Sequence, residues 1–119
     1  MSVAKVGSVV LDCPDPMALA RFYAEVLGGT PQQEEDWVDL EVPGGPALAF
    51  QAAPGHVPPQ WPSPEHSQQF HLDLSVEDLD TAEKRVLALG AKPLETEDRS
   101  RGWRVYADPA GHPFCLCAC

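Results

Sequence analysis

Long apolar runs are missing from this sequence, and basic residues are few. The apolar runs are far shorter than the roughly 20 residues that cross a bilayer as a helix, so we expect no membrane association. The N-terminal segment MSVAKVGSVV contains one lysine and no extended apolar stretch with a cleavage site, which predicts a cytoplasmic protein. Eight Lys and Arg stand against 18 Asp and Glu. Because phosphate binding needs local positive charge, we expect no nucleic-acid partner.

Cysteines are also few, and their placement is uneven. Cys13 stands alone, whereas Cys115, Cys117 and Cys119 alternate at the C-terminus with no second cluster to pair with. This arrangement predicts reduced thiols. As small buried apolar residues they need no further role, although alternating cysteines also suggest metal or redox chemistry.

A repeated order of elements is the main feature that is present. The chain's 119 residues suffice for one compact domain, which we place at 1–119. Residues 6–13 form a strand pattern followed by a helix pattern that opens at Asp15 and closes at Gly28. Residues 70–76 form a second strand pattern, followed by a similar helix pattern that closes at Gly90. Each copy predicts a βαβββ module in an α+β fold: module one spans 1–53, a proline-rich linker 54–68, and module two 69–119.

Strand alternation divides each module into an apolar face, expected under the helix, and a mixed face. In module two, His71 and Asp73 oppose the leucines at 72 and 74. Which face of 103–107 belongs to the mixed side is left open. The candidate ligand-binding residues on the mixed faces are Ser8, Trp37, Asp39, Glu41, Gln51 and Asp73, with His71 and Cys115 as candidate catalytic residues. Such a face can also be an ordinary sheet surface in water.

Trp61 lies in the linker stretch PPQWPSP. A tryptophan in a loop stiffened by proline can cover a binding site, or it can anchor the loop by packing. We keep it as a further ligand-binding candidate. The carboxylates of Asp39, Glu41 and Asp73 would favour a positively charged guest if they line a pocket.

Three stretches carry a family resemblance: VVLDCPDPMALARFYAEVLGG, PPQWPSPEHSQQFHLDLSVEDLDTAEKRVLALGA and WRVYADPAGHPFCLC. Together they resemble the vicinal oxygen chelate superfamily, in its glyoxalase-like, bleomycin-resistance-like branch. The resemblance covers nearly the whole chain. It implies two tandem βαβββ modules forming one cupped mixed sheet with helices outside (the glyoxalase/bleomycin resistance/dihydroxybiphenyl dioxygenase fold), often in a homodimer. Enzymes of this family hold a divalent metal between the modules and use it to bind substrate oxygens.

The family's metal positions fall on Ser8, His71 and Cys115, with a fourth near Ala49 or Gln51. Of these, only His71 keeps the expected residue type. Serine is a poor ligand for zinc or nickel, and a His–Cys–Gln set is unusual even though a thiolate can bind zinc. The resemblance therefore disfavours an intact metal site and leaves the cofactor unknown.

Two functions remain open at this level, together with the option of a dimerisation module. The first is sequestration of a small, cationic or aromatic molecule in the cup, in the manner of bleomycin-resistance relatives. The second is a glyoxalase-like lyase or isomerase, in which His71 is a ligand or general base and Cys115 a ligand or nucleophile. The residues leave open whether the chain is an enzyme.

Overall fold

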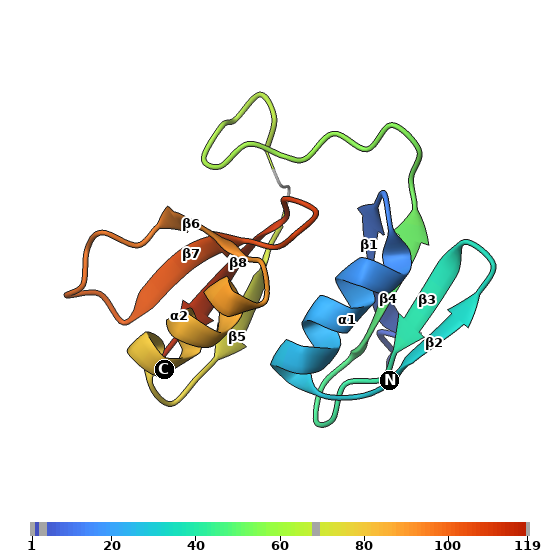
Figure 1. Cartoon of the computed structure of the whole chain (residues 1–119), viewed down its shortest axis with the longest axis horizontal. Coiled ribbons are helices and arrows are strands. Elements are labelled where there is room, and N and C mark those ends of the chain that lie inside the picture. Colours follow the sequence, from blue (N-terminus) through green and yellow to red (C-terminus); the bar gives the residue numbers. More distant parts are fainter. Residues whose placement is uncertain (1, 3–4, 68–69, 119) are drawn as a thin grey trace. The chain divides into compact units, whose positions relative to one another are not determined.

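The computed structural model describes residues 2, 5–67 and 70–118. It divides the chain into two compact units, residues 1–56 and 57–119, and each is described by itself. The described part of the linker predicted at 54–68 lies mostly in the second unit. Each unit contains one four-stranded mixed sheet and one helix (Figure 1). The predicted α+β fold of two βαβββ modules is confirmed.

The first unit has the sheet order β1-β4-β3-β2, with β1 parallel to β4 and the other pairs antiparallel. Its elements are β1 Ser8–Cys13, α1 Pro16–Leu27, β2 Pro31–Glu34, β3 Trp37–Leu40 and β4 Ala47–Ala52. The helix starts where predicted, because the Asp15 side chain accepts a hydrogen bond from the Ala18 N–H at 3.2 Å and Pro16 fits the first turn. It ends at Gly28, whose φ of 90° suits glycine.

An apolar core joins α1 to this sheet. Tyr23 of the helix stacks on Phe50 of β4, with ring centroids 5.8 Å apart, and neither residue is exposed. The other buried apolar residues of the unit are Leu11, Cys13, Leu19, Ala20, Phe22, Val38, Leu40, Leu48 and Ala49. Nearly all occupy the alternate strand positions and helix face predicted to be apolar, so burial of their surface is the main force holding the helix in place.

The second unit repeats the topology with the order β5-β8-β7-β6. Its elements are β5 Leu72–Ser75, α2 Leu79–Ala88, β6 Lys92–Glu95, β7 Trp103–Ala107 and β8 Pro113–Cys117. Strand β5 runs parallel to β8, and the remaining pairs are antiparallel. Asp78 caps α2 by accepting a hydrogen bond from the Thr81 N–H at 3.4 Å.

Polar contacts, rather than apolar ones alone, hold α2 against its sheet. Arg104 of β7 is 4% exposed and donates to Asp80 of the helix at 2.9 Å. The Tyr106 hydroxyl donates to Glu83 at 2.8 Å, and burial together with this carboxylate raises the pKa of Tyr106 to about 12. Arg104 and Tyr106 therefore lie on the face covered by α2, which settles the open question about β7 and puts Trp103 and Val105 on the opposite face.

A proline-rich strap, residues 57–67, packs against the turn between β7 and β8. That turn is built on Asp108, whose carboxylate accepts from the Ala110 N–H at 2.9 Å and from the His112 N–H at 3.0 Å. Gly111 in the turn has a φ of 94°, and a Cβ added there would lie 2.4 Å from the Cβ of Pro58. Only glycine allows the strap to approach this closely.

We expect Gly111→Ala to destabilise the protein more than Gly90→Ala does. Gly90 also has a positive φ, of 112°, but an added Cβ would meet Pro109 at an ordinary 3.6 Å. The control substitution should lower the free energy of unfolding by about 1 kcal/mol, and Gly111→Ala by about 3 kcal/mol because the steric clash adds to the backbone strain. Urea unfolding followed by circular dichroism measures both. If both substitutions lower the free energy of unfolding equally, the close approach of Pro58 does not require a glycine at position 111.

Candidate functional site

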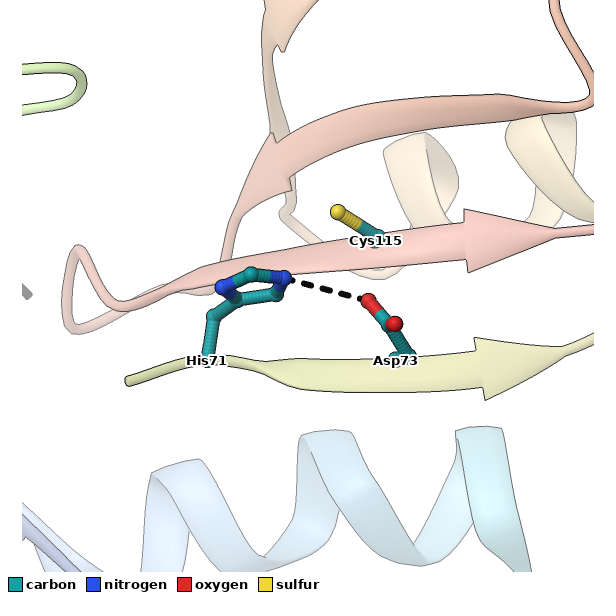
Figure 2. A group of neighbouring side chains, drawn as sticks. All are labelled: His71, Asp73 and Cys115. Carbon is teal, nitrogen blue, oxygen red and sulfur yellow. Dashed lines mark ion pairs between the residues drawn. The ribbon is translucent and has the colours of Figure 1, made fainter. Parts of the chain in front are cut away.

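Three chemically different side chains converge on the face of the second sheet that lies away from α2. They are His71, just before β5, Asp73 on β5, and Cys115 on β8 (Figure 2). The imidazole Nε2 lies 3.1 Å from Asp73 Oδ1. One donor atom from each of the three residues lies within 4.8 Å of the other two.

Backbone geometry explains this convergence. His71 and Asp73 are two positions apart on an extended segment, so their side chains project to the same side. Asp73 and Cys115 are direct partners in the parallel pairing of β5 with β8. The same row continues through Val105 of β7 to Glu95 of β6, so a carboxylate lies at each edge of the sheet with the thiol between them.

Burial differs sharply across the three residues. The Asp73 side chain is 69% exposed and the His71 side chain 31%, whereas Cys115 is buried. Burial, together with the negative charge and hydrogen bond of Asp73, raises the pKa of the Cys115 thiol to about 11; Arg101 opposes this shift. The thiol is therefore neutral at physiological pH, beneath an accessible imidazole and carboxylate.

Trp61 of the strap joins this group. Its ring stands edge-on to the His71 imidazole, with centroids 5.8 Å apart, and its indole N–H donates to Glu95 Oε1 at 3.2 Å. The predicted Trp61 candidate thus contacts side chains from both edges of the second sheet. This contact is compatible with covering a site and with anchoring the strap.

Two residues near the site were not among the sequence candidates. Glu95 lies where the β6–β7 register shifts, so simple alternation does not predict its side. Arg101 lies in the loop before β7, 3.5 Å from a Glu95 carboxylate oxygen and with its guanidinium carbon 3.8 Å from the centre of the Trp103 ring. The sequence signal for Arg101 was Trp103, two positions later, because arginine commonly stacks on tryptophan.

The remaining candidates lie in the first unit. Trp37 and Asp39 of β3 share one side, and the indole N–H donates to Asp39 Oδ1 at 2.8 Å. Gln51 pairs with Trp37 across β3 and β4, whereas Ser8 pairs with Ala47 near the far end of β4. Glu41 follows β3 and is exposed. The structure thus gathers Trp37, Asp39 and Gln51, while a cup shared by the two modules stays a prediction.

The cysteines divide into two groups. Cys13 and Cys115 are buried and not disulfide-bonded, as predicted. Cys117 is disulfide-bonded, so the expectation of reduced thiols is wrong at that position. Cys119 lies outside the described residues. Among the described cysteines, Cys115 is thus the free thiol next to the histidine.

His71, Asp73 and Cys115 offer nitrogen, oxygen and sulfur donors that fit a divalent metal. Zinc takes these donors at about 2.0–2.3 Å, which separates the donor atoms of a tetrahedral site by roughly 3.3–3.8 Å. The three donor atoms, which lie within 4.8 Å of one another, are spaced close to those values. The family positions pointed to His71 and Cys115 but not to Asp73.

The comparisons with known proteins agree with this fold. A family model described as a glyoxalase-like domain matches residues 8–117. A glyoxalase/bleomycin resistance protein/dioxygenase family enzyme from Burkholderia phytofirmans PsJN is 20% identical, with a TM-score of 0.69 over 95% of this chain and 97% of that one. The fosfomycin resistance protein FosX from Mesorhizobium loti is 15% identical, with a TM-score of 0.71 over 98% and 92%.

A third solved structure, a glyoxalase-related enzyme from Fulvimarina pelagi, is 22% identical, with a TM-score of 0.69 over 97% of this chain and 88% of that one. No curated protein matches the chain. Within the described residues, no helix has the length and apolar character needed to cross a membrane.

At these identities the solved structures show the fold alone, whereas the family model covers most of the sequence. The chain belongs to the glyoxalase-like domain family, within the vicinal oxygen chelate superfamily.

Proposed function

We propose that this protein binds a small aromatic cation on the face of the second sheet away from α2. The observation that carries the proposal is the placement of Trp61 edge-on to His71, with the carboxylates of Asp73 and Glu95 nearby. An indole next to carboxylates attracts a flat cation through stacking, cation–π attraction and charge.

Charge favours the same class of guest. The chain carries a net charge of −10, and Asp73 is mostly exposed, with His71 as its ion-pair partner in the described part of the chain. Arg101 offsets part of the Glu95 charge. In the first unit, Trp37 and Asp39 combine an indole and a carboxylate in the same way, so we include them in the proposal. Sequestration of a toxic compound would suit this chemistry, in keeping with the resistance proteins among the structural relatives.

A second candidate function is a lyase or isomerase in which His71 removes a proton next to a carbonyl. The observation that favours it is the 3.1 Å contact between His71 Nε2 and Asp73 Oδ1. A carboxylate in that place orients the ring and stabilises the imidazolium formed when the other nitrogen takes up a proton. Cys115 enters this candidate as a neutral thiol that donates a hydrogen bond, because its raised pKa leaves little thiolate for nucleophilic attack.

The binding proposal predicts charge-selective stabilisation of the chelator-treated protein. Proflavine, a planar aromatic cation, should raise the melting temperature by mass action and quench tryptophan fluorescence, whereas 9-anthracenecarboxylate, a planar anion, should do neither. Trp61→Ala should weaken proflavine binding about tenfold through loss of the cation–π contact. Val57→Ala, at a highly exposed position of the same strap, is the control. Equal responses to cation and anion would refute the proposal.

The Cys115 thiol should alkylate slowly in the metal-free folded protein. A pKa of about 11 in place of the ordinary 9.0 leaves roughly 100-fold less thiolate at pH 8. Iodoacetamide labelling resolved by peptide mass spectrometry should therefore be about 100-fold slower in the folded than in the urea-unfolded protein. Asp73→Asn should speed the folded-state reaction by removing a negative neighbour. Rapid labelling of the folded thiol would restore Cys115 as a candidate nucleophile.

The enzyme candidate predicts proton exchange without a dedicated substrate. In D₂O, the protein should accelerate the loss of protons next to the carbonyl of hydroxyacetone, observed by nuclear magnetic resonance. His71→Ala should lower the rate about 100-fold, the usual size of a general-base contribution, while His56→Ala should leave it unchanged. If hydroxyacetone exchanges its protons no faster with the wild-type protein than in buffer alone, the protein does not act as a proton-abstracting enzyme on simple hydroxyketones.

A further inference from the structure

We infer that His71, Asp73 and Cys115 form a binding site for a thiophilic divalent ion such as zinc, with all three protein ligands in the second unit. This inference goes beyond the proposed function, which requires Trp61 and the carboxylates but no metal. It assigns Asp73 a role as metal ligand, whereas the proposed function uses the same carboxylate in the metal-free protein to attract a cationic guest.

The donor set is chemically mixed, and this distinguishes it from a chance cluster of acids. An imidazole nitrogen, a carboxylate oxygen and a sulfur atom lie within 4.8 Å of one another. Zinc and cobalt accept all three donor types, whereas magnesium and calcium prefer oxygen alone. The ions expected here are therefore zinc and other divalent ions that accept a sulfur ligand, such as cobalt.

The ligands come from a backbone that holds them in place. Asp73 and Cys115 face each other across the parallel β5–β8 pair, and His71 is two residues from Asp73 on the same extended segment. Side chains on paired strands need little reorganisation to close around an ion. Cys115 is buried beneath the exposed Asp73, so an ion would enter from the side of the carboxylate and imidazole.

The ligand set differs from the one that the family resemblance implies. Those positions include Ser8 and either Ala49 or Gln51, all in the first unit, and none of these is a strong zinc ligand. With Asp73 as the third donor, no first-unit side chain is needed. Three protein ligands leave a fourth position for water or an oxygen of a bound molecule, as catalytic zinc sites do.

Cobalt titration of the chelator-treated protein tests the inference. Co²⁺ should bind with one ion per chain and produce a near-ultraviolet sulfur-to-metal absorption band, and Zn²⁺ should then displace it. Cys115→Ser should abolish the band. His71→Gln and Asp73→Asn should each weaken binding at least tenfold. Circular dichroism of each variant confirms that it is folded.

Matched controls make the result decisive. Cys13→Ser removes a second buried, reduced cysteine of the described chain, Asp39→Asn removes a carboxylate from the first sheet, and Ser8→Ala removes the family's first ligand position. All three should leave cobalt affinity unchanged. Absence of stoichiometric binding, full binding by Asp73→Asn, or loss of binding in Ser8→Ala would each overturn the inference. No organic ligand is present, so the outcome is independent of the proflavine experiment on metal-free protein.

Discussion

The parallel pairing of β5 with β8 is the constraint on which the candidate site depends. It joins two segments some forty residues apart in the chain and sets Asp73 opposite Cys115. In a sheet, a slip of one residue would turn every side chain of a strand to the other face. Leu72, Leu74, Phe114 and Leu116 resist that slip, because it would move all four from the helix-covered side to the side of the site. The apolar half of each strand thus keeps the polar half in register.

The two units reach the same topology with different helix contacts. In the first, α1 is held by a broad apolar face centred on Tyr23 and Phe50. In the second, Val86 is the buried apolar residue of α2, and Asp80 and Glu83 bind Arg104 and Tyr106 beneath it. Arg104 is buried whereas its partner Asp80 is largely exposed, and a buried charge penalises misplacement strongly because a lone charge in the interior is costly. The second helix is therefore positioned more by charge matching than by apolar area.

The sequence predicted the parts of the site that follow regular periodicity. Strand alternation placed His71, Asp73 and Cys115 on one face, and the helix cap at Asp15 set where the first module turns. It could not decide the faces of β7, because Trp103 and Tyr106 are large aromatic residues on opposite sides. Glu95 was missed because a register shift in β6 breaks the alternation. Contacts of irregular segments, such as Trp61 with Glu95, follow from tertiary packing that no periodic pattern encodes.

The strap has a consequence for the shape of any guest. Trp61 touches His71 beside one edge strand and Glu95 on the other, while Pro58 is seated against Gly111. A thin, planar molecule could pack along the indole without disturbing the contact between Pro58 and Gly111. A bulky, rounded one would have to lift the whole strap and break the indole's bond to Glu95 at the same time. Thickness, as much as charge, would then decide which compounds this surface admits.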